Sequence, residues 1–165
     1  MPKNDYVTET QDELFDKAER DIMSIDILCK DKMYPADRKY DIICFHATQA
    51  VEKFLKGYII ANGQRVKKIH NLAVLLEKTI MIDKAFKGIT TECVLLNQYI
   101  AEIKYSNRNP ISKSDIGKVL GALKTIGNFA LIKSLRDLAS KKQKYQIVTE
   151  ITVANANPKK TVGSK

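Results

Sequence analysis

The 165-residue sequence has no tryptophan, only 7 glycines and 4 prolines, and aromatic residues make up 7% of it. So few Gly and Pro exclude collagen-like and low-complexity chains, while a hydrophobic content of 44% excludes a wholly disordered one. The three cysteines, Cys29, Cys44 and Cys93, are an odd number without a Cys-x-x-Cys pair, so neither a disulfide framework nor a zinc site is encoded. Each lies in an apolar periodic stretch, where we expect a small core residue.

Long apolar runs are also missing, and none is long enough to cross a bilayer. The first ten residues are polar and acidic, where a secretory signal needs a basic patch followed by an apolar core. We therefore expect a cytoplasmic protein that does not use a membrane. A chain of this length forms one domain with a substantial core.

Acidic residues are outnumbered, with 28 Lys and Arg against 19 Asp and Glu, and the net charge of +9 favours an anionic partner. From Lys141 onward, however, six lysines face only Glu150, so more than half of the basic excess lies in the last part of the chain. We divide the sequence into a helical domain over residues 8–141 and a basic tail over 142–165. The tail lacks a helical stripe, and we expect it to be mobile or to dock only on assembly.

Apolar residues recur at spacings of three and four over four long stretches, a period that predicts amphipathic helices. The predicted helices span residues 11–30, 37–62, 84–105 and 114–140. Asn71 can cap a shorter helix between the second and the fourth. No strand pattern occurs in these segments, so the expected fold class is all-α, an antiparallel bundle of four long helices plus one short helix.

The helix ends predict how the chain turns. Gly63 can close the second helix in the left-handed conformation, and Ser114 can cap the last helix. If the short helix and its loop carry the chain back along the bundle, the loops 62–70 and 105–114 lie at the same end. We expect this arrangement, which would bring two basic loops together.

The second helix and the loop after it contain a set of residues at fixed spacings: Phe45, Gln49, Ala50, Glu52, Lys53, Leu55, Lys56, His70 and Leu72. This pattern resembles the HEPN family, the higher eukaryotes and prokaryotes nucleotide-binding domain. Members typically show Phe-x-x-x-Gln-Ala-x-Glu-Lys-x-Leu-Lys, then a Gly and a Thr-His-Asp/Asn-Leu segment, in which Ile69 here replaces Thr. The resemblance covers about residues 8–140. It implies a HEPN-like antiparallel bundle, often dimeric, that associates with nucleotides or RNA and sometimes with a nucleotidyltransferase partner.

Some members resemble metal-independent ribonucleases that act as toxins, with an Arg, a polar residue and then a His near the start of the last long helix. Arg108 and Asn109 occupy that place, but no histidine follows His70 anywhere in the chain. Cleavage through the 2′-hydroxyl needs a group that titrates near neutrality, which arginine cannot supply. We therefore expect no catalytic residue. The pair Arg65 and His70 has a similar spacing but lies in a different loop.

The predicted binding site for nucleotide or RNA phosphate combines the two loops and consists of Arg65, Lys68, His70, Arg108 and Asn109. We expect no metal and no cofactor. Three functions stay open: a homodimeric binding module for nucleotide, RNA or a nucleotidyltransferase partner, a ribonuclease toxin of a toxin–antitoxin pair, and a structural assembly domain without a ligand.

Three features of the polar residues allow a structural interpretation. His46 lies at the edge of the apolar face and is expected to be a hydrogen-bonded core histidine. His70 either caps the short helix or braces the loop, or it contacts a ligand, and these interpretations stay open. Glu52 and Lys56 have the spacing of a surface ion pair. The resemblance instead favours packing of the polar side of the second helix, which carries these two residues, on a neighbouring helix or subunit.

Overall fold

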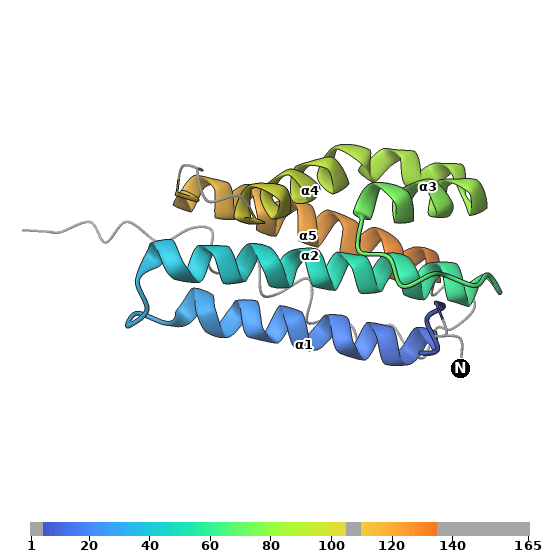
Figure 1. The fold of residues 1–165 in the computed structure, drawn as a ribbon, viewed down its shortest axis with the longest axis horizontal. Coiled ribbons are helices and arrows are strands. Elements are labelled where there is room, and N and C mark those ends of the chain that lie inside the picture. The colour runs from blue at the N-terminus through green and yellow to red at the C-terminus, as the bar shows by residue number, and fades with distance from the viewer. Residues whose placement is uncertain (1–4, 105–109, 135–165) are drawn as a thin grey trace, which may run out of the picture.

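The computed structural model describes residues 5–104 and 110–134 (Figure 1). The helices are α1 (Gln11–Lys30), α2 (Ala36–Ala61), α3 (Leu72–Ile82), the 3-10 helix η1 (Lys84–Ile89), α4 (Thr90–Lys104) and α5 (Lys113–Ser134). Extended pairing in the described part of the chain is limited to one antiparallel bridge between Tyr6 and Lys67. The predicted all-α bundle is confirmed. None of the helices in these ranges is long and apolar enough to span a membrane.

Helix α2 is the centre of the bundle and packs against α1, α3, α4 and α5. Figure 1 shows α1 and α2 side by side and antiparallel along the length of the molecule. The residues of α2 that face this core, among them Ala47, Val51 and Phe54, are completely buried. Most of its apolar residues are therefore covered within a single chain, whereas the large side chains of Ile42 and Phe45 remain 38% and 48% exposed.

Gly57 lets α1 and α2 approach closely. A Cβ atom at Gly57 would lie 2.8 Å from Cδ1 of Phe15 and closer still to Cε1 of the same ring. The Phe15 ring also packs edge-on against Phe54, with 5.6 Å between the ring centroids. Glycine at this position in α2 therefore makes room for an aromatic ring of α1.

The helix ends follow local signals closely. Helix α1 begins as predicted, with a capping box in which Thr10 and Glu13 bond each other's backbone N–H groups. The prediction that Ser114 caps the last helix is wrong, because α5 begins one residue earlier. Instead, Ser112 Oγ accepts from the Asp115 N–H at 3.2 Å, and the Asp115 carboxylate accepts from the Ser112 N–H at 3.0 Å.

Two other predicted boundaries have different outcomes. The predicted helix over 84–105 is interrupted at its start, because residues 84–89 form the 3-10 helix η1 before α4 begins at Thr90. The predicted end of the last helix near residue 140 lies outside the described residues, as does the tail 142–165.

The prediction that the loops 62–70 and 105–114 share one end is also wrong. Helix α3 points back towards the end of the bundle at which α2 finishes, so α4 starts there and runs antiparallel to α2 (Figure 1). The ring of Phe86 in η1 accordingly lies 4.4 Å from that of Tyr58, near the end of α2. The end of α5 is tied to the same region by an ion pair of 2.6 Å between Lys133 and Asp83. The start of α5 thus lies at the opposite end, beside the α1–α2 turn.

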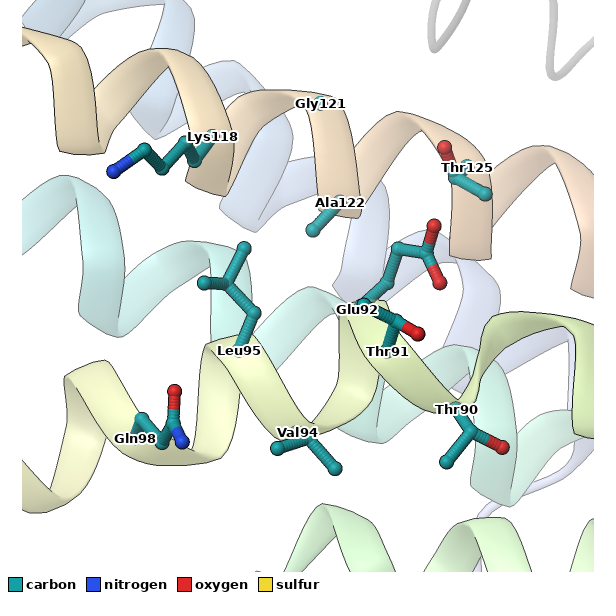
Figure 2. Close-up of a pocket in the computed structure, with 10 residues that line it drawn as sticks. All are labelled: Thr90, Thr91, Glu92, Val94, Leu95, Gln98, Lys118, Gly121, Ala122 and Thr125. Carbon is teal, nitrogen blue, oxygen red and sulfur yellow. The ribbon is translucent and has the colours of Figure 1, made fainter.

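A shallow groove of about 560 Å³ runs between α4 and α5 (Figure 2). Its lining carries one cation, Lys118, and one acid, Glu92. Among the described residues, the buried Oε2 of Glu92 has no hydrogen-bond partner.

Burial, together with the negative charge of Glu92, raises the pKa of the neighbouring Cys93 thiol to about 12. This thiol is therefore protonated and unreactive at neutral pH, in agreement with a structural role.

Candidate functional site

The segment that links α2 to α3, residues 62–71, is the part of the predicted site that the structure describes, and we call it the strap. It is fixed by backbone hydrogen bonds to the chain before α1. The Val7 N–H donates to the Val66 carbonyl, and the Lys68 N–H donates to the Asp5 carbonyl, both at 2.9 Å. The Val66 side chain is fully buried. The strap therefore has a defined path although it contains no helix.

The basic side chains of the strap point outward. Arg65 and Lys68 are exposed, as is Lys67 between them. The guanidinium carbon of Arg65 lies 4.0 Å from the centre of the Tyr6 ring, a cation–π contact that holds the guanidinium over the aromatic face. An arginine held in this way offers its N–H edges and its outer face to a ligand.

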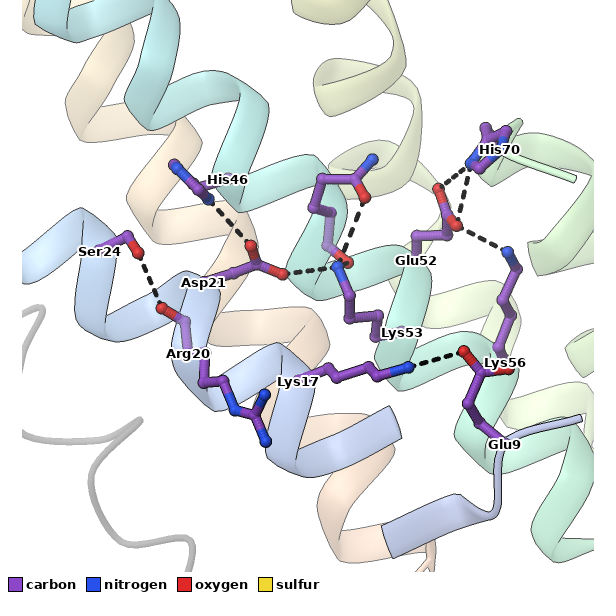
Figure 3. A network of polar contacts seen from close by, with 11 residues as sticks. Glu9, Lys17, Arg20, Asp21, Ser24, His46, Glu52, Lys53, Lys56 and His70 are labelled. Atoms are coloured by element: carbon purple, nitrogen blue, oxygen red, sulfur yellow. Dashed lines mark hydrogen bonds and ion pairs between the residues drawn. The ribbon is translucent and has the colours of Figure 1, made fainter. Parts of the chain in front are cut away.

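His70 is oriented by a buried ion pair (Figure 3). Its Nδ1 lies 3.1 Å and 3.0 Å from the two carboxylate oxygens of Glu52, and Glu52 Oε1 accepts from Lys56 Nζ at 2.6 Å. The side chains of Glu52 and Lys56 are each only 6% exposed, whereas that of His70 is 74% exposed. Nδ1 beside a carboxylate carries the proton, so Nε2 is the ring nitrogen left to face a ligand.

The burial of Glu52 and Lys56 corrects the interpretation of this pair as a surface ion pair. Residues 69–72 and helix α3 pack on this side of α2. The four-residue spacing of Glu52 and Lys56, which suggested an ion pair in solvent, therefore belongs to a buried ion pair. The alternative suggested by the resemblance, packing against a neighbouring element, is the one that the structure shows. Glu52 thus links α2, through His70, to the strap.

A second polar network joins α1 to α2 on the other side (Figure 3). Asp21 of α1 accepts from Lys53 Nζ at 2.7 Å, and its other oxygen lies 2.9 Å from His46 Nδ1. Lys53 also contacts the Gln49 side chain at 3.4 Å. His46 is therefore a partly buried, hydrogen-bonded histidine as expected, and these residues hold two helices together.

The start of α3 supports the end of the strap. Asn71 caps α3 by accepting from the Ala73 and Val74 N–H groups, so the capping role that stayed open for His70 belongs to Asn71. Asn97 of α4 accepts from the Leu72 N–H at 3.3 Å and donates to Asn71 Oδ1 at 3.2 Å. Asn97 and Tyr6 were not found from the sequence, since neither belongs to a motif or a periodic pattern.

Of the five predicted site residues, the structure places Arg65, Lys68 and His70 on one strap. Arg108 and Asn109 lie outside the described residues. The predicted convergence of both loops on one phosphate involves these two residues, so it too lies outside the described part of the chain. The roles of all five residues in binding stay predictions. Within residues 5–104 and 110–134, no group of three or more His, Cys, Asp or Glu side chains is arranged to hold a metal ion.

These observations define an all-α antiparallel bundle whose central helix carries a polar motif that fixes an exposed basic strap. The family model described as the HEPN domain matches residues 11–146, and the chain belongs to the HEPN domain family. Searches of curated proteins and of solved structures gave no match. Family membership is consistent with a module related to nucleotides or RNA.

Proposed function

We propose that this chain is a binding module that engages the phosphates of a nucleotide or of RNA through the strap. The observation that carries the proposal is the exposed His70 ring, which the buried Glu52 carboxylate holds with Nε2 outward. The same ten-residue strap presents Arg65 and Lys68. Side chains fixed before binding lose little conformational entropy when a ligand arrives.

The three side chains supply different contacts. Arg65 can bind a phosphate with two parallel N–H donors, and the outer face of its guanidinium can stack on a base. Lys68 supplies a point charge, and Nε2 of His70, with the ring proton on Nδ1, can accept a hydrogen bond from a ribose hydroxyl beside the phosphate. Tyr6 beneath Arg65 limits the motion of that arginine. This combination suits a flexible single strand better than a duplex, since bases can reach the stacking face only when unpaired.

Binding of a short fluorescein-labelled oligouridylate, followed by fluorescence anisotropy without divalent metal, tests the proposal. Arg65→Ala and Lys68→Ala should each weaken binding several-fold and reduce the salt slope by about 0.7 for each lost phosphate contact on a single strand. His70→Ala should weaken binding with less effect on the slope. Lys87→Ala, at an exposed lysine of η1, is the matched control and should bind as wild type does. Strap variants that bind RNA unchanged would overturn the proposal.

The proposed site is separable from the rest of the basic charge. Replacing Lys159 and Lys160 by Ala should affect a compact nucleotide less than the strap variants do, because a tail offers charge without a fixed site. Arg108 and Asn109 stay predicted phosphate contacts, and Arg108→Ala tests them in the same titration. No binding of RNA or nucleotide even at low salt would favour the structural assembly domain instead.

A ribonuclease is the second candidate function. The carboxylate of Glu52 on Nδ1 of His70 is also the arrangement that orients a histidine for acid–base chemistry. Metal-free incubation with labelled RNA separates the two functions. Cleavage that is lost in His70→Ala would replace the non-catalytic interpretation by a ribonuclease toxin with His70 as its proton-transfer group and Arg65 as its phosphate ligand.

The proposed module acts in the cytoplasm as a homodimer, with a nucleotidyltransferase as a possible partner protein, as in other members of the family. The exposed Ile42 and Phe45 of α2 offer apolar surface for a second copy. Light scattering at micromolar concentration should give twice the chain mass of 18.7 kDa. A mass of one chain would contradict the homodimer without bearing on the strap.

A further inference from the structure

A second concave surface lies far from the strap, at the end of the bundle where α5 begins. It is a groove of about 680 Å³ between α5 and the residues around the α1–α2 turn. Five lysines line it, and we call it the lysine groove: Lys30, Lys32, Lys39, Lys113 and Lys124. Asp31 is the one acidic residue in this lining, and Lys30 is paired with Asp26 at 2.6 Å, so the groove together with this partner carries a net charge of +3. Such a surface attracts an acidic partner.

The floor of the lysine groove is apolar. Ile43 and Ile116 are almost completely buried there, and Leu120 and Tyr40 are half-buried. An RNA backbone gains little from such a floor, because its phosphates and sugars need polar partners. A ligand that fits this groove must therefore combine apolar groups, which contact the floor, with anionic groups, which reach the lysines.

The groove is elongated along α5. The lining residues of α5 run from Lys113 to Lys124, which at 1.5 Å per residue is roughly 16 Å, or three helical turns. A compact anion could not reach the lysines at both ends. Gly117 and Gly121 lie between them, and a Cβ atom added at either glycine would meet nothing within 4 Å. This part of α5 therefore allows close approach of another backbone.

From these observations we propose that the lysine groove docks an acidic amphipathic helix of a partner protein, with its apolar stripe on Ile116 and Leu120 and its carboxylates on the lysine rim. Charge complementarity selects this occupant over two others. The chain from Lys141 onward carries six lysines and one glutamate, so its own tail would be repelled. A second copy of the groove would bring +3 against +3.

The probe is a synthetic acetylated peptide of about 12 residues, the length of three helical turns, with leucines on one face and glutamates beside them. We expect micromolar binding to the full-length protein, weakened by salt. In two-dimensional amide NMR spectra, the peptide should shift the signals of Gly117 and Gly121 but not that of Gly88. A control peptide with glutamine in place of each glutamate should bind at least tenfold more weakly.

Gly117→Leu blocks the lysine groove without disturbing the fold. The position is exposed, open and helical, so leucine should not lower the melting temperature. We expect at least a tenfold loss of peptide affinity, whereas Gly88→Leu, at an equally open glycine of η1, should bind as wild type does. Lys113→Glu combined with Lys124→Glu should give a similar loss.

Three results would overturn the inference: no binding of the acidic peptide, unchanged binding in Gly117→Leu, or equal binding of the glutamine peptide. Single-stranded RNA that shifts the same two glycine signals and displaces the peptide would instead assign the groove to nucleic acid. Because the strap variants do not touch this groove, loss of RNA binding in them and loss of peptide binding here are independent outcomes.

Discussion

Replacing Glu52 by glutamine should destabilise the fold, because it leaves the Lys56 ammonium buried without a counter-charge. Both side chains are 6% exposed and their charged atoms lie 2.6 Å apart. Breaking a buried ion pair costs about 3–5 kcal/mol. We expect about 3 kcal/mol, the lower end of that range, since the amide oxygen of glutamine can still accept a hydrogen bond from Lys56. Urea denaturation followed by circular dichroism measures this change in the free energy of unfolding.

Two further variants make the reasoning on Glu52 refutable. Adding Lys56→Met to Glu52→Gln removes the buried charge and should restore most of the lost stability. Asp26→Asn breaks an ion pair with Lys30 that is largely exposed, with 67% of the Lys30 side chain in contact with solvent, and should cost below about 1 kcal/mol. If Glu52→Gln costs no more than Asp26→Asn, the ion pair is solvated in solution and the explanation of how His70 is held is wrong.

Three other predictions concern packing, capping and pH. Gly57→Ala should lower the free energy of unfolding by about 1–3 kcal/mol because of its clash with Phe15, offset by about 1 kcal/mol of gained helix propensity. Adding Phe15→Leu should recover part of this loss in a double-mutant cycle. Ser112→Ala should lower the free energy of unfolding by about 1 kcal/mol while Ser114→Ala changes it little, and the reverse order would restore the cap expected from the sequence. Hydrogen bonds from the Ser112 side chain and backbone, and from Tyr99, hold the pKa of the Asp115 carboxyl well below its usual range. The ionised carboxylate therefore contributes fully to the free energy of unfolding above the unfolded pKa of about 3.9. This contribution is lost as the pH falls from that value towards the lower pKa of the folded state. Urea denaturation across this pH range should show that Asp115→Asn loses less free energy of unfolding on acidification than wild type does. An identical loss in both proteins would refute the role of Asp115.

The sequence predicted what local chemistry determines. The period of the apolar residues located each α-helix, and the ends of α1 and the cap of α3 at Asn71 were correct. The start of α5 was missed because two serines compete there. Ser112 has an acid, Asp115, three residues later to complete a reciprocal cap, which is the signal that could have decided between them.

The direction of α4 could not be predicted in this way, because it depends on contacts between distant residues. Asp83 and Lys133 form an ion pair although they lie 50 positions apart in the sequence, and no local pattern predicts this contact. The burial of Glu52 was hidden for a related reason. Helical periodicity tells which residues of α2 are polar, but not that residues beyond the helix fold back to cover a polar arc.

The most direct test of the central claim uses the fact that the chain contains only two histidines, His46 and His70. Their ring signals in NMR spectra can be assigned with His70→Gln and followed while oligouridylate is added. The strap proposal predicts that the His70 signal shifts in step with binding, while that of His46, held against Asp21 between α1 and α2, stays in place. Binding that leaves the His70 signal unmoved, or that moves His46 instead, would contradict it.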